Sequence, residues 1–223
     1  DDPVGYIPAL ADAGYFDSLS ITGEDRARTG LYRANHAREA LRESATDLPT
    51  YLRGLDMRLL WRSFDPVGLR RIVQLINKSN QFNLTTRRYT EDDIRAVMDD
   101  PAAFGLQLRL LDRFGDNGII AIVIGRLHDN TELLIDTWLM SCRVLGRAVE
   151  QATLELIVQQ AVRLGARRVL GEYRPSGRNA MVRDHYANLG FVIAATGPDG
   201  ASRSVLEVGC HRPSNTFIHV QEG

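Results

Sequence analysis

The chain has 223 residues, 44% hydrophobic and 25% charged, with a formal net charge of -1 at pH 7. This composition and length are typical of a globular protein with one sizeable core and an appendage. The near-neutral charge argues against nucleic acid or an anionic membrane as the main partner. No apolar run approaches the ~18 residues of a membrane helix, no signal peptide is visible, and two cysteines are too few for a disulfide framework, so we expect a cytoplasmic protein.

The first 56 residues contain no strand candidate and predict a helical arm. Residues 24–44 are charged throughout, with apolar residues at spacings of three and four, which gives a narrow apolar stripe on a solvated helix. The chain begins "DDPVGYIPAL" without methionine, so we expect it to be excised from a longer protein. The expected division is an arm over 1–56, one α/β domain over 57–210 and a C-terminal tail over 211–223.

From residue 57 onward, strand and helix patterns alternate regularly. Thr90 is a suitable N-cap, and Asn117-Gly118 is a strong hairpin signal. The expected elements are a strand at 57–64, a helix at 66–80, a polar stretch at 81–89, a helix at 90–100, strands at 104–113, 118–127 and 131–140, a helix at 147–165, a strand at 167–174, a helix at 178–190 and strands at 191–195 and 204–209.

A glycine-containing turn joins the strand at 131–140 to the next helix. It carries the pattern Arg143-x-x-Gly146-x-Ala148. Free N–H groups and the helix dipole favour negative or polar ligands at such a turn, and Gly146 lets a ligand backbone approach closely. A pattern of this length is weak evidence alone, because it occurs often by chance.

The order of elements and two motifs resemble the acetyltransferase superfamily called GNAT. Arg143, Gly146 and Ala148 match its turn, while Asn179, Tyr186, Gly190 and Phe191 match the motif of its last helix. The resemblance implies a mixed, mostly antiparallel sheet flanked by helices, preceded here by the arm. It also implies that the turn residues Arg143, Gly146, Arg147 and Ala148, with Asn179, hold a phosphopantetheine arm.

Three residues are candidates for catalysis. Cys142 lies at the end of a strand, flanked by Arg143 and expected at a helix N-terminus, and both features favour thiolate over thiol. Such a thiol is suited to covalent acyl transfer, but a small buried residue in a β–α corner is the alternative. His185 is a candidate base because its ordinary pKa is near neutrality. The resemblance implies that Tyr186 protonates a departing thiolate, and packing between helix and sheet is the alternative for its ring.

The stretch 74–90 is rich in amides and hydroxyls. It predicts either a pocket for a small hydroxyacyl group or a solvated cap and turn, since Ser, Asn and Thr suit both. The GNAT arrangement favours the pocket. The candidate substrate-binding residues are Asn77, Asn80, Gln81, Asn83, Thr85 and Arg87.

Nearly the whole chain, from about residue 5 to 206, also resembles the C-terminal half of FkbH-like proteins of polyketide biosynthesis. The resemblance rests on "RLLDRFGDNGIIAIVIGR", "IDTWLMSCRVLGRAVEQATL" and "MVRDHYANLGF". It implies that a glyceryl unit from 1,3-bisphosphoglycerate, or a similar unit such as lactyl, passes through Cys142 to an acyl carrier protein. In that family a haloacid-dehalogenase-like phosphatase domain precedes this segment, but this chain lacks the Asp-x-Asp motif that such a phosphatase needs.

Three functions follow as hypotheses. The leading one is a carrier-protein acyltransferase with no tightly bound cofactor or metal, whose phosphopantetheine arrives on an acyl carrier protein and whose phosphatase acts in cis or in trans. The second is an ordinary GNAT enzyme that acylates an amine from coenzyme A and needs no cysteine. The third is a non-catalytic module that docks a carrier protein.

Overall fold

The computed structural model describes residues 23–129 and 131–223, so predictions for residues 1–22 lie outside the described part of the chain. The chain divides into two compact units, Asp1–Ser44 and Ala45–Gly223. In the first unit, helix α2 spans Gly23–Ser44, as the pattern over 24–44 predicts. The second unit begins ahead of residue 57 and contains a sheet with its helices.

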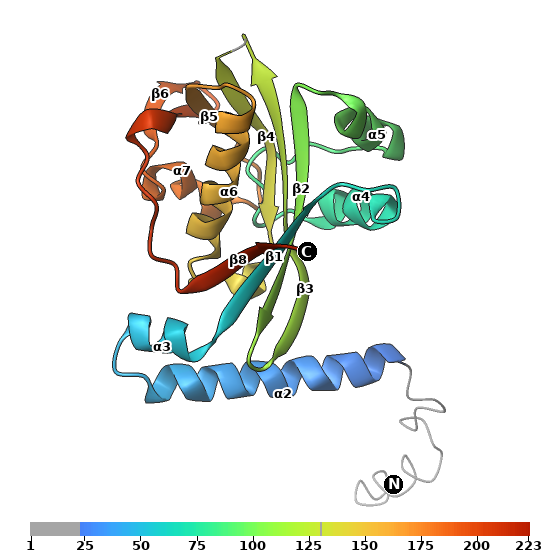
Figure 1. The fold of residues 1–223 in the computed structure, drawn as a ribbon, viewed down its shortest axis with the longest axis vertical. Coiled ribbons are helices and arrows are strands. Elements are labelled where there is room, and N and C mark those ends of the chain that lie inside the picture. The colour runs from blue at the N-terminus through green and yellow to red at the C-terminus, as the bar shows by residue number, and fades with distance from the viewer. Residues whose placement is uncertain (1–22, 130) are drawn as a thin grey trace, which may run out of the picture. The chain divides into compact units, whose positions relative to one another are not determined.

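The second unit contains an eight-stranded sheet in the order β6-β7-β5-β4-β3-β2-β1-β8 (Figure 1). Parallel pairing joins β4 to β5 and β1 to β8, and the other neighbours are antiparallel. This confirms the expected mixed, mostly antiparallel sheet. The elements are α3 (Leu48–Gly54), β1 (Met57–Ser63), α4 (Leu69–Lys78), α5 (Glu91–Asp99), β2 (Ala103–Asp112), β3 (Gly115–His128), β4 (Glu132–Met140), α6 (Val149–Arg163), β5 (Arg168–Tyr173), α7 (His185–Asn188), β6 (Val192–Thr196), β7 (Ser202–Glu207) and β8 (Ile218–Glu222).

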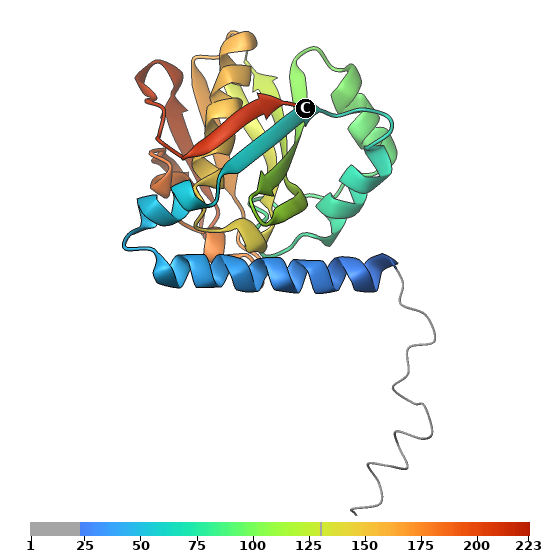
Figure 2. The ribbon, with the colours of Figure 1, turned by 60° about the horizontal axis from the view of Figure 1, so that its bottom comes forward.

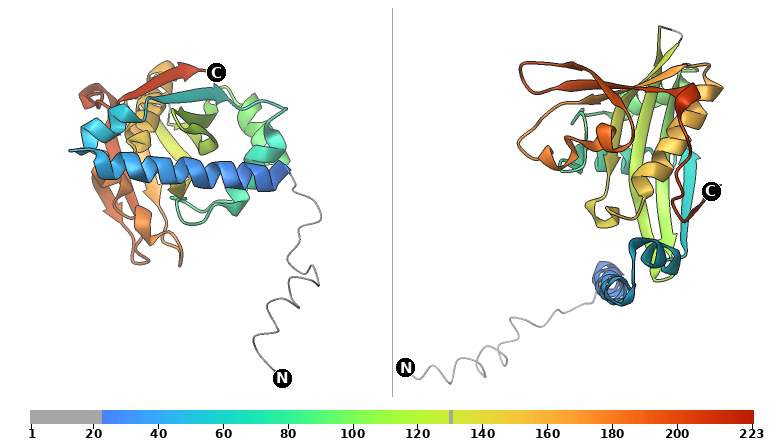
Figure 3. Two further views of the ribbon diagram at one scale, coloured as in Figure 1. Left: turned by 90° about the horizontal axis from the view of Figure 1, so that it is seen from below. Right: turned by 90° about the vertical axis from the view of Figure 1, so that its left-hand side faces the viewer.

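Helices cover both faces of the central strands. Helices α4 and α5 lie on one face and α6 on the other (Figure 3). Leu69, Ile72 and Ile76 of α4, at helical spacing, are buried in a cluster with residues of β3 and α5. The predicted N-cap of α5 is confirmed, because Thr90 and Asp93 form a reciprocal capping box.

A short segment of the chain lies between β4 and β5 where these strands separate. β5 pairs with β4 only from Glu132 to Ile135. Farther along β4, the Leu84 N–H donates to the Trp138 carbonyl at 3.2 Å, and the Met140 N–H donates to the Phe82 carbonyl at 3.1 Å. The residues from Phe82 to Leu84 therefore satisfy the edge of β4 that β5 leaves open.

The predicted hairpin between β2 and β3 is confirmed, but its turn lies at residues 113–114 and not at Asn117-Gly118. β2 ends at Asp112 and β3 begins at Gly115, so both residues lie inside β3. The Asn117 amide donates to the Leu110 carbonyl and to Asp112, and Gly118 has φ of +70° beside a register shift. The pair therefore forms an irregularity within the ladder, since a bulge and a tight turn both favour Asn and Gly.

The C-terminal tail expected over 211–223 also differs from the structure. Residues Ile218–Glu222 form β8, which pairs in parallel with β1 at the edge of the sheet (Figure 2). The helix expected over 178–190 is reduced to a 3₁₀ turn at Ala180–Val182 and the short α7. After the long helix, residues Leu48–Gly54 form α3, which is capped by Asp47, whose side chain accepts from the Thr50 N–H.

Within the described ranges, no helix is both long and apolar enough to cross a lipid bilayer.

Candidate functional site

The turn between β4 and α6 contains two residues in the left-handed conformation. Gly146 has φ of +73° and Ala148, the N-cap of α6, has φ of +59°. Cys142 begins a separate 3₁₀ turn that ends at Val144, whereas α6 begins only at Val149. The helix N-terminus predicted at or just after Cys142 is therefore that of a single 3₁₀ turn and not that of α6, because two positive φ angles interrupt the chain before α6 starts.

Cys142 is exposed and lies in an open cavity of about 610 Å³, here called the thiol cavity. The end of β4 forms one side of this cavity, and the chain that follows α4 forms another. Lys78 and Arg178 place two cations in its lining. The other lining residues are Ser79, Asn80, Gln81, Phe82, Met140 and Ser141.

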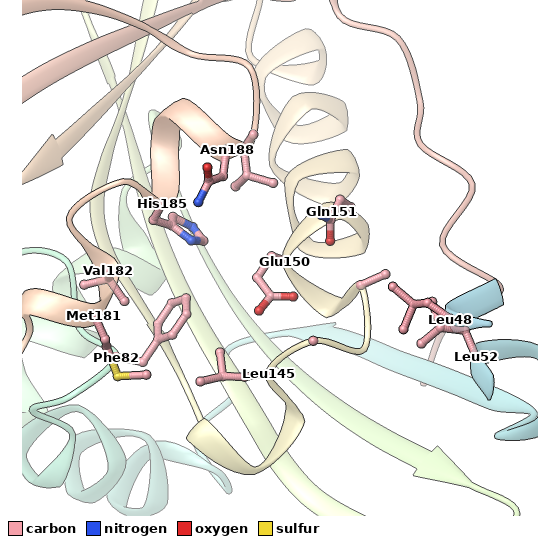
Figure 4. A pocket seen from close by; sticks show the side chains of 13 residues that line it. Leu48, Leu52, Phe82, Leu145, Glu150, Gln151, Met181, Val182, His185 and Asn188 are labelled. Atoms are coloured by element: carbon pink, nitrogen blue, oxygen red, sulfur yellow. The ribbon is translucent and has the colours of Figure 1, made fainter. Parts of the chain in front are cut away.

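A second cavity of about 330 Å³, here called the α6 cavity, lies between the first turn of α6, α7 and α3 (Figure 4). Gly146 and Ala148 of the turn line it, so the predicted ligand-binding turn does border a cavity. Most of its walls are apolar. The remaining lining residues are Leu48, Leu52, Phe82, Leu145, Glu150, Gln151, Met181, Val182, His185, Asn188 and Leu189.

His185 is a buried residue of the α6 cavity. Its ring packs edge-on against Trp138, with centroids 4.5 Å apart, and against Phe82 at 5.1 Å. Burial among these rings lowers the pKa of His185 from 6.5 to about 4. Its Nε2 atom is buried without a hydrogen-bond partner in the described part of the chain. The imidazole is therefore neutral at pH 7 and has an unused polar atom beside the cavity.

Glu150 contributes the carboxylate of the α6 cavity. Burial raises the pKa of Glu150, while hydrogen bonds from the backbone N–H groups of Glu150 and Gly146 oppose that rise. These N–H groups belong to the turn and to the first turn of α6, where a helix has free donors. The side chain of Glu150 therefore uses donors that the sequence predicts for a ligand.

Phe82 lines both cavities. Its ring is 4% exposed and packs edge-on against His185, and its carbonyl accepts from Met140. Cys142 lines only the thiol cavity, and His185 lines only the α6 cavity. The structure therefore does not place the candidate nucleophile and the candidate base in one cavity.

Tyr186 and Asn179 lie in the interior. Tyr186 is 2% exposed, and its ring packs at a tilt of 53° against Phe191, with centroids 4.9 Å apart. Its hydroxyl group makes no well-formed hydrogen bond. The Asn179 amide donates to the carbonyls of Asn83 and Arg174, both at 2.9 Å. This geometry favours packing for Tyr186 and a structural role for Asn179, because neither residue lines the two cavities described above.

The two arginines of the turn differ in environment. Arg143 is exposed, and its Nε donates to the Ser141 hydroxyl at 3.1 Å. Arg147 is 8% exposed and pairs with the buried carboxylate of Asp112 at 3.4 Å. A buried guanidinium paired in this way anchors the turn to the end of β2 and does not point to a ligand.

Only two of the six predicted substrate residues, Asn80 and Gln81, line the thiol cavity. The others make internal contacts. Asn77 bonds the backbone of Tyr89, Asn83 accepts from the Thr86 N–H, Thr85 donates to the Asp136 carbonyl, and Arg87 forms ion pairs with Asp136 and Glu172. These amides and hydroxyls mainly shape the polar loop, which is the cap-and-turn alternative.

Sequence reasoning missed Glu150, Phe82 and Arg178. Glu150 follows a predicted turn at a helix start, where an acidic residue is ordinary and gives no signal of a cavity. Phe82 is an isolated aromatic in a polar stretch, and that contrast was an available signal. Arg178 lies beside the thiol cavity only because the chain after β5 folds back toward the end of β4.

Comparison with solved structures establishes the GNAT fold. The GNAT domain of S. lividans PAT is similar with a TM-score of 0.51 and 18% identity, covering 66% of this chain and 89% of that one. Ard1 from Thermoplasma volcanium gives 0.50 and 17%, covering 67% and 97%. The yncA protein from Salmonella typhimurium, solved with its cofactor acetyl-CoA, gives 0.50 and 14%, covering 70% and 98%.

No protein-family model and no curated protein sequence matches the chain. The comparisons leave the resemblance to FkbH-like proteins untested, and it stays a prediction.

Proposed function

We propose that the protein is an acyltransferase in which Cys142 carries a short hydroxyacyl group, with glyceryl as the leading choice, as a thioester. The single observation that carries this proposal is the position of Cys142, whose thiol is exposed in a polar cavity at the end of β4. A structural cysteine in a β–α corner is ordinarily buried, whereas a nucleophile must reach its substrate. The GNAT fold supports acyl transfer as the reaction class.

The chemistry takes two steps. The Cys142 thiolate attacks the acyl carbonyl of the donor, an S–C bond forms, and the bond to the donor's leaving group breaks. The thiolate of a phosphopantetheine arm then attacks the Cys142 thioester, takes the acyl group and releases the Cys142 thiolate. Because the thiol cavity is open, protons released on forming the two thiolates pass to solvent.

The lining of the thiol cavity suits a small hydroxyacyl unit. Asn80, Gln81 and Ser141 offer amide and hydroxyl groups that can bond hydroxyls, and Lys78 and Arg178 suit an anionic donor such as an acyl phosphate. The acyl carrier protein as acceptor and a phosphatase partner are part of the proposal. They are supported by the resemblance to FkbH-like proteins.

Direct transfer from acyl-coenzyme A to an amine is a second candidate. The observation that favours it is that Cys142 does not line the α6 cavity, which the turn and the start of α6 border. In that mechanism the thioester lies in the α6 cavity and Cys142 takes no part, so replacing Cys142 leaves the rate unchanged.

Intact-protein mass spectrometry after incubation with glyceryl-loaded carrier protein tests the proposal, because it runs the second step backwards and needs no phosphatase. We expect a glyceryl-sized adduct on the native protein and on Cys210→Ala, but none on Cys142→Ala. Cys210→Ala is the matched control, because Cys210 is also exposed and lies outside both cavities. An adduct that persists in Cys142→Ala, or no adduct on a folded native chain, would refute the covalent mechanism.

A further inference from the structure

A third cavity, here called the arginine cavity, has a volume of about 350 Å³ and shares no lining residue with the thiol cavity or the α6 cavity. Strand pairing puts Leu60 of β1 opposite Arg109 of β2. Arg62 lies opposite Gln107 two residues farther along, so all four side chains share one face of the sheet. The lining residues are Leu60, Trp61, Arg62, Arg71, Gln107, Leu108, Arg109, Gly118, Ile119 and Gly223.

The lining of the arginine cavity is positively charged. Among its residues, all in the described part of the chain, three are arginines and none has an acidic side chain. Arg62 comes from β1, Arg71 from α4 and Arg109 from β2. The first turn of α4, which contains Arg71, has no acidic residue, and no side chain caps this helix. Acidic residues are favoured there because a helix N-terminus carries partial positive charge, so an arginine at this position adds to a charge of the same sign.

Nearby carboxylates neutralise two of these arginines, to different extents. Asp116 holds Arg109 through Nε and a terminal nitrogen. Arg62 reaches Asp65 through Nε alone, at 3.5 Å, and the same carboxylate also accepts from the Gln107 amide at 3.2 Å. The pair at 3.5 Å is longer than a charge-assisted hydrogen bond. Arg62 is therefore only partly neutralised.

Arg71 is not neutralised by a carboxylate. Its guanidinium donates to the Gln74 side chain and forms no ion pair within the described residues. A guanidinium is always charged and has five N–H donors, so most of these donors stay available. Leu60 and Ile119, both half-buried, add apolar surface to the same cavity. Cationic donors beside apolar walls complement a ligand that has an apolar body and one anionic group.

We propose that the arginine cavity is a second binding site of this protein, for a small organic acid with an apolar body. The carboxylate pairs with Arg71 and Arg62, because the planar fork of arginine bonds a carboxylate through two parallel N–H groups. The apolar body packs on Leu60 and Ile119. Cys142 does not line this cavity, so the second site does not depend on the proposed acyl transfer.

Heteronuclear NMR of the full chain with 3-phenylpropionate tests the proposal. Trp61 lines the cavity, whereas Trp138, the other tryptophan of the chain, is fully buried and does not line it. We expect 3-phenylpropionate to shift the indole N–H signal of Trp61 and not that of Trp138, with the two signals assigned by Trp61→Phe. The amide 3-phenylpropionamide has the same shape without the charge and should bind at least about tenfold more weakly.

Two neighbouring arginines of α4 give a variant and its matched control. Arg71→Gln should weaken the binding of 3-phenylpropionate at least about tenfold. Arg70→Gln should bind within about twofold of the native chain, because Arg70 does not line the cavity and pairs with Glu91. Equal binding of acid and amide, unchanged binding in Arg71→Gln, or no shift of the Trp61 signal at about 10 mM acid would overturn the proposal. Cys142→Ala should bind the acid like the native chain, so failure of the covalent mechanism leaves this test unaffected.

Discussion

Lowering the pH should destabilise the folded chain through protonation of His185 in the unfolded state. A single substitution at His185 should remove this contribution. The pKa of this histidine is lowered from 6.5 to about 4 by burial against Trp138 and Phe82. Between these two pH values the unfolded chain binds a proton at this position and the folded chain does not. Stability therefore rises with pH across this window and is fully present above about pH 6.5.

The magnitude follows from the difference between the two pKa values. Below pH 4, where the whole difference in proton binding is realised, the free energy of unfolding is lower by about 3 kcal/mol. At pH 5, where the unfolded histidine is mostly protonated and the folded one is mostly neutral, the loss is about 2 kcal/mol. Near pH 7.5 it is close to zero.

Urea unfolding at pH 7.5 and at pH 5, followed by circular dichroism, measures this loss. Other groups also titrate, so the relevant quantity is the native change minus that of His185→Leu, which cannot take the proton. We expect the variant to lose about 2 kcal/mol less between the two pH values. His219→Gln, at an exposed histidine of β8, is the control and should behave like the native chain. Equal losses in the native chain and His185→Leu would refute the reasoning.

Two further substitutions, one of them with a matched control, separate structural roles from functional ones in the predicted site. Arg147→Met leaves the buried carboxylate of Asp112 without its ion pair and should lower the free energy of unfolding in urea by about 3 kcal/mol. The control Arg143→Met, at an exposed position, should change that free energy by no more than about 0.5 kcal/mol. A fully stable Arg147→Met would show that the pair contributes nothing. Tyr186→Phe removes a buried hydroxyl that makes no well-formed hydrogen bond, so stability should hold or rise by about 1 kcal/mol and acyl transfer should continue at the native rate. A loss of about a hundredfold in that rate would instead restore Tyr186 as the proton donor.

Local patterns in the sequence were sufficient for most of the architecture. Strand alternation, helical spacing and the Thr90 cap report hydrogen bonding and burial within a few residues, and these elements form where the sequence places them. The turn after β4 was also readable, because Gly146 takes a positive φ that glycine favours. The mixed character of the sheet was implied by the resemblance to the GNAT superfamily, and the strand pairing confirms it.

Patterns failed where a local signal had two structural solutions. Asn117 and Gly118 suit a bulge as well as a hairpin turn, and the choice depends on the bond from Asn117 to Asp112 within the folded ladder. Strand β8 was expected to be part of a tail, because it is a strand only through its pairing with the edge strand β1. In both places a partner on another strand decides the outcome.

The composition of the site was decided by tertiary contacts. Arg147 pairs with a carboxylate 35 residues away, and Asn179 bonds a carbonyl 96 residues away, so both turn inward although their motifs suggested a ligand. A polar side chain bonds whichever partner folding brings within about 3 Å, and burial makes leaving it unpaired costly. The sequence by itself determined the elements, the turn and the thiol at its start. Only the tertiary structure decided that Cys142 lines one open cavity, while Glu150 and His185 line another.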